Sequence, residues 1–311
     1  MSTSNDIKTL AEALSNIGAK VSPAKVKSVL TMKASNAKGE VMEIDPSIVD
    51  ELEIAIHTKS NINLVGPPGC GKSTIKDVLL GQINEDFKKI QCHKGLDIEE
   101  LFGGPVPDGN GFTMKLGEVA LCARDGIPLG MEEVDSLNPD RVFPLFPLLG
   151  PDKWIDIQLG AETTRVIKSP DFFVIATSNT NGTGDYDGAF AGTEIMNSAL
   201  ADRFSYTINV DYLKPDQELK ILQLKTGISD KIGQEMIQVA KDTRYQAAAQ
   251  QGVQALSTRR LIAWAQAVVA AETLGKKMSI TQAAKIAILN RAPEEYKMAM
   301  SEVINRKFSG R

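Results

Sequence analysis

The stretch NLVGPPGCGKST, residues 63–74, decides the fold of this chain. It contains the pattern G-x-x-x-x-G-K-[ST], with an apolar run before it and the helix-compatible run TIKDVLL after it. The residues that meet the pattern are Gly66, Gly69, Gly71, Lys72 and Ser73. Glycines at this spacing let successive backbone N–H groups point into one concavity at a helix N-terminus, where the helix dipole favours phosphate. The stretch therefore predicts a strand, a phosphate-binding loop and a helix, and with them an α/β fold.

The loop also supplies candidate ligands for a nucleotide and a metal ion. Lys72 would reach the β- and γ-phosphates of a bound nucleotide, and the hydroxyl of Ser73 would ligate Mg²⁺. We interpret Cys70 as a small residue that fills a variable loop position, and not as a catalytic thiol. As part of the loop, Cys70 is still a candidate nucleotide-binding residue, together with Pro67, Pro68 and Thr74.

Composition narrows the class of protein. With 311 residues, 42% of them hydrophobic, the chain is long enough for one large domain and a smaller one. A balance of 35 basic against 39 acidic residues gives a net charge of −4, so the chain as a whole has no electrostatic attraction to nucleic acid or to an anionic membrane. Three cysteines and two histidines complete no metal-ligand pattern, and no apolar stretch approaches the roughly 18 residues that span a bilayer. We expect a reduced, cytoplasmic protein.

Three regions follow from the changes of pattern along the chain. Residues 1–44 predict a short helical appendage, with helices near 7–17 and 22–30 and the polar linker KASNAKGE at 33–40. Residues 45–211 alternate helices with short apolar strands, which indicates a mainly parallel sheet covered by helices on both faces. Residues 212–311 have helical periodicity throughout and predict a small all-helical domain.

The expected strands lie in five short segments and two hairpins. The segments of the sheet are 62–65, 89–92, 127–131, 172–176 and 204–210. The hairpins are PVPDGNGFTM at 105–114, whose tip either lines a pore or is a plain surface turn, and WIDIQLGAETTRVI at 154–167. We expect both tryptophans, Trp154 and Trp264, to lie in the core.

Polar residues follow these strands where a ligand of a parallel sheet would bind. Glu132 and Glu133 end one strand, Asn179 follows the next, Arg203 precedes the last, and Arg259 opens a helix of the second domain. Hydrolysis of a phosphoanhydride needs acids that hold Mg²⁺ and orient water, an amide that positions the water, and arginines that stabilise charge on the γ-phosphoryl group. The set matches those needs, although a small-molecule kinase, a nucleic-acid-associated ring and a protein that binds nucleotide without turnover remain open.

These motifs together resemble the AAA+ ATPases, and within them the MoxR-type group. VGPPGCGKST is similar to the Walker A motif of that group, LGMEEVD to Walker B, IATSN to sensor 1, ALADRF to the arginine-finger segment and STRR to sensor 2. The segment GTGDYDGAFAGTEIMNSALADRFSYTINVDYLKP is most similar to the ATPase subunits of aerobic cobaltochelatases. The resemblance covers about residues 46–290 and implies a P-loop AAA+ sheet followed by a helical lid.

The resemblance also implies a role for each site residue. Glu133 would be the catalytic base, Asn179 sensor 1, Arg203 a finger acting on the ATP of a neighbouring subunit, and Arg259 sensor 2. ATP and Mg²⁺ would be the cofactors, and the assembly would be a six-membered ring that remodels a partner carrying a von Willebrand A domain.

The chain departs from the family at Glu132, where the family has Asp, and in its N-terminal helices. The extra methylene moves the carboxylate about 1.5 Å further out, a shift that a ligand acting on Mg²⁺ through water can absorb. We therefore expect hydrolysis to tolerate Glu132→Asp and not Glu133→Gln.

Overall fold

The computed structural model describes residues 34–35, 41–42, 46–109, 111–180, 195–249 and 253–308. The two helices predicted near 7–17 and 22–30 lie outside these residues. Part of the predicted linker is paired: β1 (Ala34–Ser35) runs antiparallel to β2 (Val41–Met42). A ladder of two residues is too short to produce an alternating pattern, so the sequence carried no signal for it.

A parallel sheet of five strands forms the centre of the large domain. Its strands are β3 (Ile62–Val65), β4 (Lys88–Gln91), β7 (Leu129–Glu132), β10 (Val174–Ser178) and β11 (Tyr206–Asn209). They are ordered β11-β3-β10-β7-β4, and each neighbouring pair is parallel. β3 and β10 are buried along their whole length, including the polar residues Asn63, Thr177 and Ser178. Burial on both faces is why most residues of these strands are apolar. The predicted sheet is confirmed, with strand ends shifted by a few residues.

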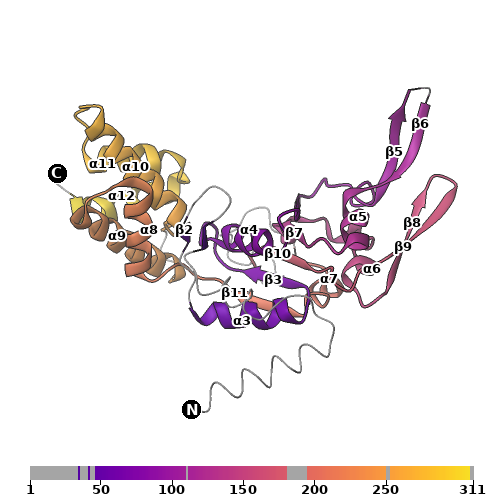
Figure 1. The fold of residues 1–311 in the computed structure, drawn as a ribbon. Helices are drawn as coiled ribbons and strands as arrows, with labels where there is room; N and C mark the ends of the chain where they lie inside the picture. Colours follow the sequence, from indigo (N-terminus) through magenta and orange to yellow (C-terminus); the bar gives the residue numbers. More distant parts are fainter. Residues whose placement is uncertain are drawn as a thin grey trace, which may run out of the picture.

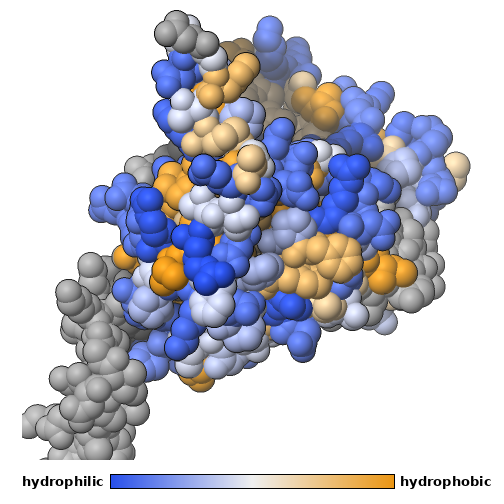
Figure 2. Space-filling model, turned by 90° about the vertical axis from the view of Figure 1, so that its right-hand side faces the viewer, coloured by the Kyte–Doolittle hydropathy of each residue, from blue (hydrophilic) through white to orange (hydrophobic). Residues whose placement is uncertain are grey.

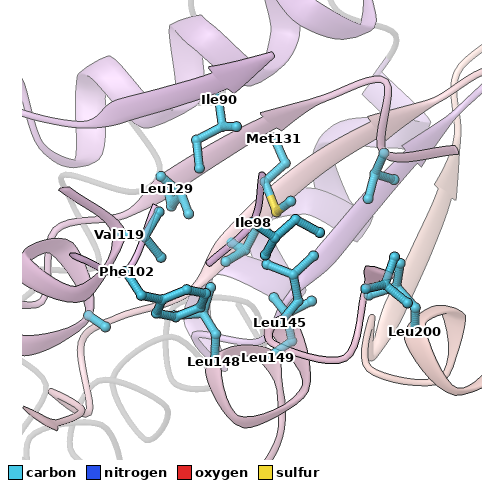
Figure 3. Packing of buried hydrophobic residues seen from close by; sticks show 14 of the residues in the cluster. Ile90, Ile98, Phe102, Val119, Leu129, Met131, Leu145, Leu148, Leu149 and Leu200 are labelled. Carbon is cyan, nitrogen blue, oxygen red and sulfur yellow. The ribbon is translucent and has the colours of Figure 1, made fainter. Parts of the chain in front are cut away.

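Helices cover both faces of this sheet. On one face, strand residues such as Ile62 and Ile175 pack with α3 (Pro46–His57) and α4 (Lys72–Ile83). On the other, residues such as Leu129 and Met131 pack with three helices and the loops between them (Figure 3). Those helices are α5 (Glu118–Asp125), α6 (Leu145–Leu149) and α7 (Ser198–Ala201). Short 3-10 turns follow β7 at Val134–Ser136 and Pro139–Arg141.

Two antiparallel hairpins project from one end of the molecule (Figure 1). β5 (Gly103–Asp108) pairs with β6 (Gly111–Leu116), and β8 (Trp154–Leu159) pairs with β9 (Glu162–Ile167), as predicted. Seen from that end, hydrophobic residues, in orange, lie on the surface among hydrophilic ones, in blue (Figure 2). Phe112 of β6 is 74% exposed. The expectation for Trp154 was wrong: its side chain is exposed on β8 and lies under the guanidinium of Arg165, 4.9 Å from the ring centre. A cation–π contact from the neighbouring strand can stabilise an indole ring that lies outside the core.

Five helices form the second domain at the opposite end of the molecule (Figure 1). They are α8 (Pro215–Thr226), α9 (Asp230–Ala248), α10 (Thr258–Thr273), α11 (Ile280–Ala287) and α12 (Glu294–Phe308), with a 3-10 turn at Leu289–Arg291. Trp264 is fully buried here, edge-on to Phe308 with ring centres 5.4 Å apart, as expected for a core residue. Across the described ranges, no helix combines the length and apolar character needed to cross a bilayer.

Candidate nucleotide site

The loop between β3 and α4 has the backbone that its glycines predicted. Gly69 and Gly71 have φ angles of 74° and 111°, in the left-handed region that other residues avoid. Gly66 is required for a different reason, since a Cβ there would lie 1.9 Å from the carbonyl oxygen of Val210. The loop can therefore approach β11 closely, and the turn leads directly into α4 at Lys72.

Lys72 is buried and held between the loop and the end of β10. Its ammonium donates to the carbonyl oxygens of Gly66 (2.6 Å) and Pro67 (3.0 Å), and to Oδ1 of Asn179 (3.1 Å). Burial lowers the pKa of this ammonium. The thiol of Cys70 donates to the Val210 carbonyl at 3.2 Å, and burial raises its pKa, so the thiol packs against protein and has no feature of a nucleophile.

The oxygens at the end of β7 suit a magnesium ion. The hydroxyl of Ser73 donates to Oε2 of Glu132, and the hydroxyl of Thr177 lies 3.3 Å from the same oxygen. A serine hydroxyl beside a carboxylate is the hard oxygen donor set that Mg²⁺ prefers. The donors present therefore fit the ion.

Glu133 makes contacts quite unlike those of its neighbour. Its φ angle is 55°, so the chain turns sharply after β7, and its backbone N–H donates to the hydroxyl of Thr177 at 3.1 Å. The side chain is exposed, with Nε2 of Gln91 3.4 Å from Oε2. The carboxylate of Glu133 therefore faces solvent at this turn.

Asp135 is a site residue that the sequence reasoning missed. It is 1% exposed, and its Oδ2 accepts from the backbone N–H groups of Asn179 (2.8 Å) and Thr180 (3.1 Å) and from the Thr180 hydroxyl (3.3 Å). Its Oδ1 is buried and has no hydrogen-bond partner among the described residues. Asp135 thus joins the end of β7 to the segment that carries Asn179. The third acid of the stretch EEVD was the signal that could have revealed it.

Arg203 lies away from the residues just described. Arg203 precedes β11, whereas the phosphate loop follows β3. Because these two strands are parallel, Arg203 lies at their amino ends and the loop lies at their carboxyl ends. Its Nη1 donates to the carbonyl of Ala199 (2.6 Å), and its guanidinium lies over the ring of Phe146 at 3.9 Å. The structure does not bring Arg203 to this chain's own loop.

The lid brings Arg259 to the loop. A Cβ on Gly69 would lie 2.8 Å from Cβ of Ser257 and 3.5 Å from Cβ of Arg259, so the start of α10 abuts the loop directly. Arg259 is exposed there, whereas Nη1 of Arg260 points into the lid toward the carbonyl of Ala287, 3.5 Å away. The geometry favours Arg259 over Arg260 as the arginine near a bound nucleotide.

A buried ion pair braces this part of the lid. Glu218 of α8 accepts from Nη1 and Nη2 of Arg244 on α9, at 2.8 and 2.7 Å, and from the hydroxyl of Thr258. Arg244 also lies over the ring of Tyr212, 3.8 Å from its centre, and the Tyr212 hydroxyl is 3.3 Å from the Pro68 carbonyl. The chain of contacts connects three lid helices to the phosphate loop.

Comparison with known proteins agrees with this geometry. The family described as AAA domain (dynein-related subfamily) matches residues 61–204, and the family CbbQ/NirQ/NorQ C-terminal matches residues 218–306. The aerobic cobaltochelatase subunit CobS of Sinorhizobium sp. is 27% identical over 88% of this chain and 85% of its own length. The denitrification regulatory protein NirQ of Pseudomonas aeruginosa is 22% identical over 72% of this chain and 80% of its own.

Solved structures show the same fold. A RuvB variant from Thermotoga maritima superposes with a TM-score of 0.53 at 14% identity, covering 86% of this chain and 76% of that one. One of the two families matches the sheet domain and the other matches the lid. Together with the relatives CobS and NirQ, these matches show that the chain belongs to the AAA+ ATPases of the MoxR-type group.

Proposed function

We propose that this chain is a Mg²⁺-dependent ATPase that works as a six-membered cytoplasmic ring and remodels a partner protein with a von Willebrand A domain. The observation that carries the proposal is the separation of two half-sites on one chain. Lys72, Ser73 and Glu132 lie at the carboxyl ends of the parallel strands. Arg203 lies at the opposite, amino ends. An arginine so placed can complete only a neighbour's site, and a closed ring gives every subunit such a neighbour.

Each residue of the first half-site has a separate task in this proposal. Ser73 and Glu132 would hold Mg²⁺, which neutralises charge on the β- and γ-phosphates when it is bound. Lys72 would turn from its loop carbonyls to the phosphates. Glu133 would orient the attacking water and accept its proton, and the amide of Asn179 would hold that water in line.

Arginines from two directions would stabilise the transferred phosphoryl group. Arg259 comes from the lid of the same chain, and its distance to the phosphates changes whenever the lid moves. Arg203 comes from the neighbour, and its reach changes whenever two subunits shift. Hydrolysis would thereby be coupled to motion within and between subunits.

The proposal of a protein partner rests on the relatives and on charge. CobS is by its name one subunit of an aerobic cobaltochelatase, and NirQ is by its name a denitrification regulatory protein. The net charge of −4 offers no general attraction to nucleic acid. We therefore favour a protein over a nucleic acid as the remodelled partner.

A complementation experiment tests the ring and the role of Arg203 together. Glu133→Gln should bind ATP without hydrolysing it, and Arg203→Ala should also be inactive. Mixing the two should restore phosphate release at interfaces that combine an intact Glu133 with an intact Arg203, about one quarter of them for random mixing in a ring. Arg124→Ala is the control, because Arg124 is exposed and pairs only with Asp125 next to it.

Three outcomes would contradict the proposal. A strict monomer in sedimentation and negative-stain imaging with Mg²⁺ and ATP would rule out the ring. Failure of the mixture to recover activity would rule out Arg203 as the shared residue. A pull-down with Glu133→Gln and ATP that captures nucleic acid, and no protein with a von Willebrand A domain, would rule out the proposed partner.

A further inference from the structure

Lys76 is a fully buried lysine beside the proposed Mg²⁺ site. It follows Ser73 by three residues on α4, so both side chains lie on one face of the helix. Its ammonium pairs with Oδ1 of Asp77 at 2.7 Å and with Oε1 of Glu132 at 2.9 Å. A buried charge persists only when it is paired, so Glu132 is one of the two groups that keep this lysine in place.

The neighbouring strand is shaped to admit the lysine. Gly130 lies two residues before Glu132 on β7, and a Cβ there would lie 2.9 Å from Nζ of Lys76 and 3.4 Å from its Cδ. Any side chain at Gly130 would therefore compete with Lys76 for the same space. Asp77, the other partner of Lys76, is also held by a second lysine, since Lys89 of β4 donates to its Oδ2 at 2.8 Å.

This arrangement divides the two oxygens of Glu132 between two tasks. Oε1 faces Lys76, and Oε2 faces the hydroxyls of Ser73 and Thr177. An aspartate, about 1.5 Å shorter, could not span both Ser73 and Lys76 from the same backbone position. The contact supplies a physical reason for glutamate where the family has aspartate.

We propose that Lys76 is a positioning residue, which holds one oxygen of Glu132 so that the other faces the Mg²⁺ site, and that lysine and the longer acid work as a matched pair. The proposal deepens the function proposed above and rests on it. In this proposal Lys76 acts on Mg²⁺ binding through Glu132. Its role is to remove the rotational freedom of a ligand.

The test measures the binding of a fluorescent ATP analogue with and without Mg²⁺. The ratio of the two affinities, here called the magnesium gain, reports how well the protein holds the ion and needs no turnover. The variants are Lys76→Met, Glu132→Asp and the double variant. Lys89→Met is the matched control, because it removes a lysine from Asp77 and leaves Glu132 untouched.

We expect Lys76→Met to reduce the magnesium gain on the order of tenfold, the usual effect of removing a group that orients a metal ligand. Binding without Mg²⁺ should be unchanged, since Lys72 and the loop are intact. Glu132→Asp should also lower the gain, while hydrolysis continues when Mg²⁺ is saturating. The double variant should be no worse than the worse single variant, because without the lysine the extra methylene has nothing to reach. Lys89→Met should keep the full gain.

The results that would overturn the inference differ from those that would overturn the function. If the wild type shows no magnesium gain, the proposed function fails and the inference fails with it. If the wild type shows the gain and the two single effects multiply in the double variant, only the pairing of Lys76 with Glu132 is wrong. An unchanged gain in Glu132→Asp, a conservative variant with a partly exposed side chain, would refute the inference even if Lys76→Met did not fold.

Discussion

Replacing Glu218 with glutamine should destabilise the lid more than any other single neutralisation of a charge in it. Glutamine keeps the shape of glutamate and removes its charge, so the ion pair with Arg244 is lost where Glu218 is 1% exposed. The amide oxygen can still accept from one guanidinium nitrogen, but the amide NH₂ group cannot accept from the other, so one of the two hydrogen bonds, at 2.7 and 2.8 Å, is lost as well. Breaking a buried ion pair by removing one partner costs about 3–5 kcal/mol. Arg244 keeps its contact with Tyr212 and its bond to the Leu256 carbonyl, so we expect the lower end, about 3 kcal/mol.

Urea unfolding followed by tryptophan fluorescence measures this cost. The chain has two tryptophans, and in a Trp154→Phe background the signal comes from Trp264, which is fully buried in the lid. At a slope of about 2 kcal/mol per molar urea, the midpoint should fall by about 1.5 M. Glu294→Gln is the control within the same lid, because Glu294 is exposed and its pair with Lys297 should contribute nothing measurable.

The reasoning would be refuted if Glu218→Gln moved the midpoint no further than Glu294→Gln. A second check is the double variant Glu218→Gln with Arg244→Met, which removes both charges and should recover part of the loss. Nucleotide affinity should fall in parallel, because the Glu218 network includes Thr258, the residue before Arg259.

Three further predictions follow from single contacts. Asp135→Ala leaves the backbone N–H of Asn179 without an acceptor and should cost about 3 kcal/mol in urea unfolding, together with slower phosphate release at unchanged ATP affinity; equal loss of binding and turnover would contradict a positioning role. Gly66→Ala puts a Cβ 1.9 Å from the Val210 carbonyl oxygen and should abolish nucleotide binding in a fluorescence titration, at a cost of about 3 kcal/mol or more. Burial raises the pKa of Tyr212 to about 12, from an ordinary value of 10.0, so its contribution to stability should be full below pH 10 and be lost as the pH rises toward 12. Burial also raises the pKa of Cys92 to about 12 and that of Cys122 to about 11, so these thiols add to the fall of urea midpoints at high pH. Tyr212→Phe should make that fall less steep, and an unchanged fall would contradict the prediction.

Local patterns were enough to predict most of the fold. The apolar runs of β3 and β10 are buried on both faces, so they stand out as short hydrophobic segments next to turn residues. The first hairpin was visible from its glycine-containing turn, and the second because its residues alternate on either side of Gly160. Strand ends shifted by a few residues because hydrogen bonding to a neighbour, and not hydrophobicity, decides where a ladder stops.

Residues whose role depends on distant partners were harder to predict. Trp154 was expected in the core because indoles are usually buried, but its place on an outer hairpin leaves it exposed beneath Arg165. No prediction was made for Asp135, because its partners Asn179 and Thr180 follow β10, more than forty residues further along the chain. In both cases the deciding contact comes from a residue outside any local window.

The phosphate loop and its glycines were determined by the sequence alone, because backbone conformation and spacing within twelve residues specify them. Glu132 and Glu133, the first two acids of EEVD, were likewise visible as candidates. Only the tertiary structure decided what each does: β7 lies beside α4, so Glu132 meets Ser73 and Lys76, and the turn after β7 sends Glu133 outward. The same is true of Arg203, whose distance from the loop follows from two parallel strands lying side by side. Sequence spacing predicts which residues share an element, and packing between elements decides which of them share a site.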